Sequence, residues 1–297
     1  MRVFVTGATG FVGGAVVREL LDSGHRVLGL ARSDASADRL AATGAEVHRG
    51  SLDDLDALRA GASACDGVIH TGFVHDFSDY GACVALDLSA VETLIDTLAG
   101  SDRPLVVTSV MSHGRTEDEI PDPAARPDLV RLPAEVRTLT AADRGVRGSA
   151  IRLPQVHGEG DHAFVPALID IARAKGVSGY VGGGTNLWAA VHREDAAPLY
   201  RLALENAPAG TVLHAVADEG IPVREIAEVI GKRLDIPTTS VPPEQAGAHF
   251  GWLGHFVSSD LTGTSTLTRQ RFGWTPTRIG LLADLDHDYY FDINQPS

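Results

Sequence analysis

Two regular patterns of apolar and polar positions alternate along the first half of the chain. Short continuous apolar runs are typical of strands buried on both faces, and they predict strands at residues 3–5, 27–31, 45–48, 67–70, 105–109 and 147–153. Between them, apolar residues three and four apart predict helices at residues 13–23, 35–42, 52–60, 84–99 and 133–143. Strands that alternate with helices imply parallel strands with right-handed crossovers. We therefore expect a Rossmann-type, doubly wound α/β domain over residues 1–153.

The second half of the chain is less regular. Helical patterns occur at residues 163–175, 194–205, 223–234, 264–272 and 279–290, and strand patterns at residues 178–181, 189–192 and 211–215. Residues 237–259 are rich in Pro, Gly, His and aromatic residues and predict irregular structure. We expect residues 154–297 to form mainly a smaller substrate-binding lobe, with some segments returning to the first domain.

Three glycines follow the first apolar run at a fixed spacing. Gly7, Gly10 and Gly13 lie between this strand and the first helical pattern, which is the setting of a dinucleotide-binding motif. Gly7 allows a tight turn, Gly10 lets the backbone approach a pyrophosphate, and Gly13 lets the helix pack on the strand. The helix N-terminus supplies unpaired N–H groups for the phosphates. The residues that we expect to bind the cofactor here are Gly7, Thr9, Gly10, Phe11, Val12 and Gly13.

The residues after the second predicted strand indicate which nicotinamide cofactor is preferred. An acid at this position would bind the ribose 2′-hydroxyl, whereas an arginine would accommodate a 2′-phosphate. Here Arg32 and Ser33 come first and Asp34 follows them. We therefore expect NADP(H) to be preferred over NAD(H), the alternative being that Arg32 is a solvated surface residue.

Composition and charge exclude several classes of partner. The 297 residues are 44% hydrophobic and carry a net charge of −14, which argues against nucleic acids and anionic membranes. We expect no transmembrane helix, no signal peptide and a cytoplasmic location. Cys65 and Cys83 are too few for a disulfide framework and are expected to pack in the core, and the twelve histidines match no compact zinc spacing. The oligomeric state stays open, with a homodimer as one alternative.

Several further segments resemble the extended short-chain dehydrogenase/reductase superfamily, and the resemblance covers nearly the whole chain. The glycine turn is similar to its Thr-Gly-x-x-Gly-x-x-Gly motif, residues 68–73 to its Val-Ile-His-x-Ala-Ala segment, and residues 152–161 and 191–197 to two later motifs. The resemblance places Ser109 at the catalytic serine. It also implies further cofactor contacts, at Ser51, Leu52, Thr71, Gly72 and Phe73.

The sequence departs from this superfamily at the catalytic Tyr-x-x-x-Lys. None of the five tyrosines has a lysine four residues later. Aligning on Glu135 puts Pro127 at the tyrosine position and Arg131 at the lysine position. Arg131 can hold the nicotinamide ribose but cannot release a proton. The chain therefore resembles atypical members that keep the nucleotide site without the standard pair.

Other side chains must then donate or accept the proton of the reaction. Ser109 ends a predicted strand, and His113 and His157 follow strand ends, where parallel sheets bind ligands. Imidazole also titrates near neutral pH. The alternative for each histidine is capping a turn or bonding a backbone carbonyl. His75 and two tryptophans, Trp188 and Trp252, are expected to bind substrate, with core packing as the alternative for the tryptophans.

Together these features predict an NADP-dependent oxidoreductase with a non-standard proton donor. The expected reaction is reduction of a carbonyl, an imine or an activated alkene on a small organic molecule. One alternative is a regulatory sensor that binds NADP without turnover. Another is a sugar-nucleotide epimerase or dehydratase, which Pro127 and Arg32 disfavour.

Overall fold

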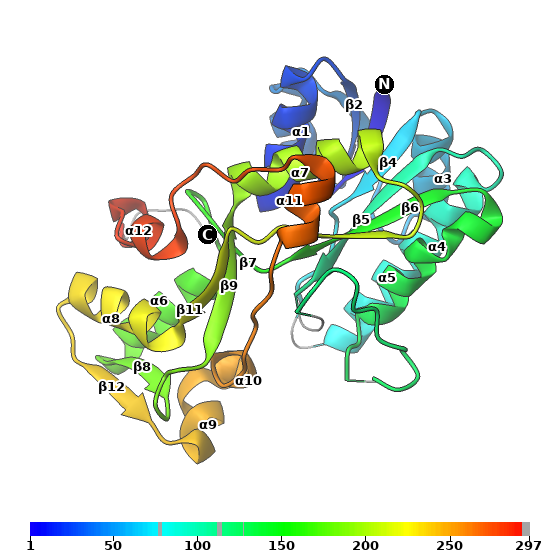
Figure 1. The fold of residues 1–297 in the computed structure, drawn as a ribbon. Helices are drawn as coiled ribbons and strands as arrows, with labels where there is room; N and C mark the ends of the chain where they lie inside the picture. The colour runs from blue at the N-terminus through cyan, green and yellow to red at the C-terminus, as the bar shows by residue number, and fades with distance from the viewer. Residues whose placement is uncertain (77–78, 112–114, 127, 293–297) are drawn as a thin grey trace.

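Seven parallel strands form the larger sheet of the computed structural model, in the order β10-β6-β5-β4-β1-β2-β3 (Figure 1). The structure describes residues 1–76, 79–111, 115–126 and 128–292. The strands are β1 (Arg2–Thr6), β2 (Arg26–Ala31), β3 (Glu46–Arg49), β4 (Gly67–His70), β5 (Pro104–Val110), β6 (Arg147–Leu153) and β10 (Thr211–His214). The chain order reverses between β1 and β4, which is where open α/β sheets bind ligands. The predicted doubly wound fold is confirmed.

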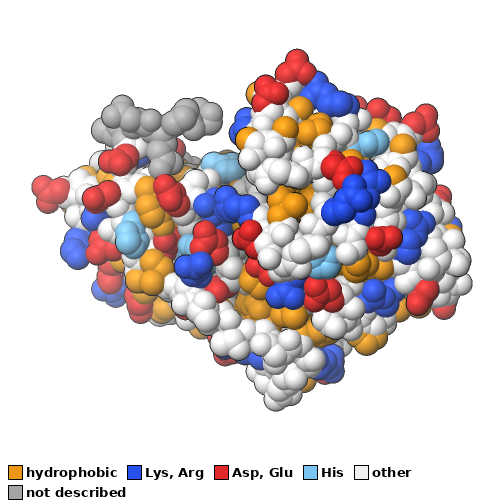
Figure 2. Space-filling model, turned by 90° about the horizontal axis from the view of Figure 1, so that it is seen from above, with side chains coloured by type: hydrophobic (Ala, Val, Ile, Leu, Met, Phe, Trp, Pro, Cys, Tyr) orange, Lys and Arg blue, Asp and Glu red, His pale blue; other side chains and the backbone are white. Residues whose placement is uncertain are grey.

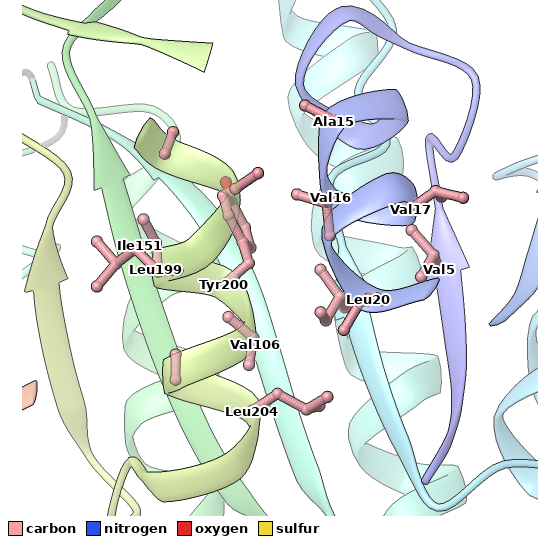
Figure 3. Close-up of a cluster of buried hydrophobic side chains, with 14 of the residues drawn as sticks. Val5, Ala15, Val16, Val17, Leu20, Val106, Ile151, Leu199, Tyr200 and Leu204 are labelled. Carbon is pink, nitrogen blue, oxygen red and sulfur yellow. The ribbon is translucent and has the colours of Figure 1, made fainter. Parts of the chain in front are cut away.

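Helices cover both faces of this sheet. On one face lie α1 (Phe11–Asp22), α2 (Asp34–Ala41) and α7 (Arg193–Asn206), and on the other α3 (Leu55–Ser63), α4 (Tyr80–Leu98) and α5 (Leu132–Leu139). Figure 3 shows Leu20 of α1 and Leu199 and Tyr200 of α7 packed over the sheet, all fully buried. The Tyr200 hydroxyl lies 2.8 Å from Thr108 Oγ1, so this core tyrosine is satisfied internally.

Two helices begin where an aspartate caps them rather than where the apolar pattern suggested. The Asp54 side chain accepts from the Ala57 N–H at 3.0 Å, so α3 begins at Leu55. Asp79 accepts from the Ala82 N–H at 3.1 Å, so α4 begins at Tyr80. The apolar pattern alone does not reveal such caps, because a capping side chain is polar.

The smaller lobe contains two sheets, ordered β11-β9-β7 and β12-β8. Their strands are β7 (Gln155–His157), β8 (Ser178–Val181), β9 (Leu187–His192), β11 (Asp218–Pro222) and β12 (Thr238–Val241). The later helices are α6 (Phe164–Lys175), α8 (Val223–Leu234), α9 (Ala246–Phe250), α10 (Gly254–Val257), α11 (Thr266–Phe272) and α12 (Leu281–Leu285). Short 3₁₀ turns lie at η1 (Ala141–Arg144), η2 (Pro243–Gln245), η3 (Gly251–Leu253) and η4 (Asp288–Tyr290).

The sequence prediction was wrong for two segments of the second half. Residues 237–259 are not irregular, since they contain β12, α9 and α10. Residues 279–290 do not form one helix, because the chain bends after α12 and brings the hydroxyls of Tyr289 and Tyr290 back to the Asp284 carboxylate. Two segments do return to the first domain, since β10 joins the edge of the large sheet and α7 packs against α1.

Acidic and basic side chains intermingle over both lobes on the face that Figure 2 shows. Cys65 and Cys83 are both buried and unbridged. Within the described ranges, no helix is long and apolar enough to span a membrane, and no three His, Cys, Asp or Glu side chains gather as a metal site.

Candidate functional site

The glycine turn between β1 and α1 packs tightly against the loop after β4. Gly7 has a φ of 65°, which glycine adopts without steric cost. A Cβ atom on Gly7 would lie 2.7 Å from the backbone nitrogen of Gly72, and one on Gly13 would lie 2.0 Å from the Gly7 carbonyl oxygen. Gly10 begins α1 without a side-chain cap, which leaves the first N–H groups of the helix for a phosphate. The turn therefore has the close-packed backbone that a pyrophosphate site requires.

Gly13→Ala is expected to abolish nucleotide binding and to lower the free energy of unfolding by about 1–3 kcal/mol, because its Cβ displaces the Gly7 carbonyl. Gly14 is a matched control in the same helix. A Cβ there would lie 3.9 Å from the Ala8 carbonyl oxygen, which is ordinary contact. Gly14→Ala should keep nucleotide binding and raise the free energy of unfolding by up to about 1 kcal/mol. Urea denaturation measures the free energy of unfolding, and NADPH titration measures nucleotide binding. Equal stability and equal NADPH affinity in the two variants would contradict the role given to Gly13.

The carboxyl ends of the paired strands β2 and β3 present two arginines, Arg32 directly after β2 and Arg49 at the end of β3. Among the described residues Arg32 forms no hydrogen bond or ion pair, and its side chain is exposed. Ser33 caps α2 by accepting from the Ser36 N–H at 3.2 Å. Asp34 pairs with Arg49, which also donates to the Ser33 carbonyl at 2.7 Å. The nearest acid is therefore already engaged, and Arg49 is a second cation that the sequence analysis missed.

The loops after β3 and β4 lie against each other beside the turn. Thr71 donates its hydroxyl to the last carbonyl of β1 at 2.7 Å. A Cβ atom on Gly72 would lie 3.1 Å from a Leu52 methyl group, so the two loops are in contact. The Ser51 hydroxyl donates to the Asp53 carboxylate. These predicted cofactor residues therefore surround the turn, although their contacts with a cofactor stay a prediction.

Phe11, the first residue of α1, faces the smaller lobe. Its ring centre lies 5.1 Å from the Arg193 guanidinium carbon and 6.0 Å from the His162 ring centre. Val12 packs against the main core, and Thr9 is half-buried in the turn. Phe11 thus joins the glycine turn to the loop that precedes α6.

A chain of buried polar side chains connects β1 with the start of α5. Thr6 and His70 are neighbours in the sheet, with Oγ1 2.8 Å from Nδ1. His70 Nε2 lies 3.1 Å from Asp87 Oδ1, and Asp87 Oδ2 lies 3.4 Å from Arg131 Nη2. A carboxylate only accepts, so His70 Nε2 is the donor to Asp87. Burial would raise the pKa of Asp87, but the His70 bond and the Arg131 charge hold it below its usual value. An ionised Asp87 therefore fixes Arg131.

Arg131 lies at the carboxyl ends of β4 and β5. Its Nη2 donates to the Thr108 carbonyl at 3.2 Å, and its guanidinium carbon lies 4.1 Å from the centre of the Phe73 ring. Its side chain is 10% exposed, and its Nε has no partner among the described atoms. A buried donor without a partner fits the ribose-binding role that the superfamily resemblance implies. Pro127, assigned to the tyrosine position, lies outside the described residues.

Two titratable side chains, His75 and Tyr80, pack against Phe73. The ring centres of His75 and Tyr80 lie 5.1 Å and 5.9 Å from its ring centre. Desolvation, with a smaller contribution from the Arg131 charge, lowers the pKa of His75. Burial raises the pKa of Tyr80, and the Arg131 charge opposes this rise. Tyr80 therefore keeps its phenolic proton at neutral pH, and the Arg131 charge over the Phe73 ring would favour its phenolate.

Ser109 belongs to a buried ionic cluster rather than to an open surface. It is 3% exposed, and its hydroxyl donates to the Glu135 carboxylate. Glu135 also accepts from Arg152 Nη2 at 2.6 Å, and both of these side chains are fully buried. Arg152 also donates to the Glu119 carbonyl at 2.9 Å and lies 3.2 Å from His214 Nε2. Because the Ser109 hydroxyl already donates its proton to Glu135, Ser109 is a buried residue beside the site in this structure.

His157 is fully buried, and its partner is a carboxylate far along the chain. Its Nδ1 lies 2.8 Å from Asp284 Oδ2, and its ring packs edge-on against His192 at 5.4 Å. The structure therefore gives His157 a role in joining β7 to α12 and no exposed face for proton transfer. His113, the other histidine candidate, lies outside the described residues.

The two candidate tryptophans occupy different environments. Trp188 is fully buried and its indole N–H donates to the Phe256 carbonyl at 3.2 Å, so the core-packing alternative describes its place. Trp252 is 42% exposed and packs against Phe164, with 5.4 Å between ring centres. Of this pair, only Trp252 has an exposed surface.

Sequence reasoning missed Asp87 and Tyr80 as members of the site. Asp87 is 2% exposed on a largely apolar helix, and a lone acid within such a pattern is the signal that would have found it. Tyr80 gave no local signal, because its relation to Arg131 depends on how α4 packs beside α5.

Comparisons with known proteins agree with this geometry. The model of the NAD dependent epimerase/dehydratase family matches residues 3–128. An uncharacterized protein of Schizosaccharomyces pombe, C2A9.02, is 53% identical over 98% of this chain and 100% of its own length. The 2-alkyl-3-oxoalkanoate reductase of Stenotrophomonas maltophilia is 30% identical over 80% of this chain and 77% of its own.

Solved structures show the same fold. The dTDP-glucose 4,6-dehydratase DesIV of Streptomyces venezuelae, solved with NAD bound, has a TM-score of 0.77 at 19% identity, and the match covers 99% of this chain and 98% of that one. The fold, the glycine turn and the relatives lead to one conclusion: this chain belongs to the NAD-dependent epimerase/dehydratase family of the extended short-chain dehydrogenase/reductase superfamily, and it is an enzyme of the NAD(P)-dependent oxidoreductase type.

Proposed function

We propose that this protein is an NADP(H)-dependent reductase of a carbonyl group on a small organic molecule. The observation that carries the proposal is the position of Arg131, a cation fixed by Asp87 and Thr108 at the carboxyl ends of the strands beside the glycine turn. A fixed cation there suits both the nicotinamide ribose and the negative charge that develops on a carbonyl oxygen during reduction. The relative named as a 2-alkyl-3-oxoalkanoate reductase supports carbonyl reduction.

The proton in this reaction comes from Tyr80. When bound, the cofactor supplies a hydride to the carbonyl carbon, and the oxygen must then be protonated. Tyr80 holds its proton at neutral pH, and Arg131 stabilises the phenolate that remains. His75 is less suited because its lowered pKa leaves a neutral imidazole, and a neutral imidazole is a poor acid.

Arg32 provides the NADP(H) preference in this proposal, because its guanidinium is exposed without a partner among the described residues. Arg32→Asp is expected to weaken NADPH binding at least about tenfold and to reverse the order of NADPH and NADH, since a charge-assisted hydrogen bond contributes about 1.5–3 kcal/mol. Arg39→Asp makes the same charge change in the last turn of α2 and should leave both affinities unchanged. Titration of intrinsic fluorescence measures each affinity. Equal affinity of the unaltered protein for both cofactors would refute the preference.

The activity itself is tested by incubating the protein with NADPH and a panel of alkyl and aryl ketones. Loss of the nicotinamide absorbance with formation of the alcohol is the expected result. Tight NADPH binding with no ketone reduced would favour a nucleotide-binding regulatory protein instead.

A further inference from the structure

Three aromatic side chains of the smaller lobe form a continuous, partly exposed surface, which we call the aromatic cluster: Phe164, Trp252 and Phe256. The Phe164 ring centre lies 5.4 Å from that of Trp252 and 5.0 Å from that of Phe256, both edge-on. Trp252 and Phe256 are 6.1 Å apart. Fully buried Trp188 lies beneath, 6.2 Å from Phe164, so the cluster rests on a rigid base.

One side of the aromatic cluster adjoins the glycine turn. Phe164 is the first residue of α6, and His162 lies just before it. The His162 ring centre is 6.0 Å from that of Phe11, the first residue of α1. The predicted cofactor turn and the aromatic cluster are therefore separated by a single short loop.

The segment that follows α10, and with it the end of the cluster, leads to the carboxyl end of β5. The chain leaves α10 and forms a bridge between Leu261 and Trp188. A Cβ atom on Gly263 would lie 2.9 Å from the sulfur of Met111, which directly follows β5. The Thr264 N–H then donates to the Arg115 carbonyl at 2.9 Å. Figure 1 shows α10 on the side of the smaller lobe that faces the large sheet.

We propose that the aromatic cluster binds the apolar part of the substrate, so that the substrate is a ketone with an alkyl or aryl chain. This inference rests on the proposed reductase function. Exposed aromatic rings at the margin of a site gain most by covering apolar carbon, and Trp252 is among the few large apolar side chains left exposed in the described part of the chain. Aromatic rings offer few hydrogen bonds to a charged diphosphate. The cluster therefore favours a hydrophobic ketone over a sugar nucleotide.

The test uses the full chain, NADPH and straight-chain alkan-2-ones from butan-2-one to decan-2-one. In the unaltered protein kcat/KM should rise about three- to fourfold for each added methylene over part of the series, as expected for burial of a methylene group. Trp252→Ala should reduce the increase to less than about twofold for each methylene, with NADPH affinity unchanged. Ile279→Ala, which removes another exposed apolar side chain that is not part of the cluster, should keep the full increase.

Two results would overturn the cluster's role: a flat series in the unaltered protein, or the same slope in Trp252→Ala. If no ketone is reduced at all, the proposed reductase function fails separately. Calorimetric titration of decan-2-one into the NADPH-bound protein then tests whether the aromatic cluster binds an alkyl chain. Binding that Trp252→Ala weakens at least about tenfold supports it, and no binding, or equal binding by both proteins, rejects it.

Discussion

Replacing Tyr80 by Phe is expected to lower kcat for ketone reduction by about 10²–10⁴-fold while leaving NADPH affinity nearly unchanged. The phenol lies beside Phe73, whose ring Arg131 covers, and it is a described side chain that both holds a proton at neutral pH and has a cation near it. Phe keeps the ring and its packing, so only the acid is lost. Kinetics with saturating NADPH and a separate NADPH titration measure the two quantities.

The matched comparison for Tyr80→Phe is Tyr180→Phe, which removes a phenol hydroxyl in β8 of the smaller lobe and should leave kcat unchanged. Ser109→Ala tests the rival donor, and we expect a smaller loss from it because the Ser109 proton is held by Glu135. The reverse outcome, with full activity in Tyr80→Phe and a loss of 10²-fold or more in Ser109→Ala, would move the proton donor back to the serine.

Glu135→Ala is expected to lower the free energy of unfolding by about 3–5 kcal/mol, because it leaves the guanidinium of Arg152 buried without its counter-ion. Both side chains are fully buried, and Arg152 Nη2 lies 2.6 Å from Glu135 Oε1. Urea denaturation with a check of the m-value gives the change. A decrease in the free energy of unfolding of under about 1 kcal/mol would show that water or a local rearrangement compensates the unpaired charge of Arg152.

A double variant separates the loss of the pair from the cost of the unpaired charge. Glu135→Leu with Arg152→Met replaces the buried pair by apolar side chains, and it should recover much of the stability lost in Glu135→Ala. Glu228→Ala breaks an exposed pair with Arg224 in α8 and should change stability far less. A double variant as unstable as Glu135→Ala would show that packing, and not charge, sets the cost at this position.

The large sheet could be predicted from the sequence because most of its strands contain short continuous apolar runs, which are typical of strands buried on both faces. The glycine turn could be predicted for a similar reason, since the positive φ of Gly7 and the close contact of Gly13 each require glycine. The starts of the helices and the elements of the smaller lobe were harder to predict from the sequence, because polar caps and short elements depend on contacts between distant segments.

Long-range contacts also explain why two of the candidate site residues lie in the core. His157 follows a strand and resembles a proton donor locally, but Asp284, which lies 127 positions further along the chain, covers it. Trp188 lies in an apolar strand, and only the packing of α6 and α10 over it shows that it is core. Asp87, by contrast, acquires its role only because α4 brings it beside Arg131.

Transfer of deuterium from NADPH to a ketone is the most direct test of whether this protein is a ketone reductase. NADPH labelled with deuterium on either face of the nicotinamide C4 is incubated with the protein and decan-2-one, and the product is analysed by mass spectrometry. We expect decan-2-ol with deuterium on the carbinol carbon from one labelled face only, and slower formation of this alcohol in Tyr80→Phe. NADPH binding with no labelled alcohol from any alkyl or aryl ketone of the panel would contradict this function.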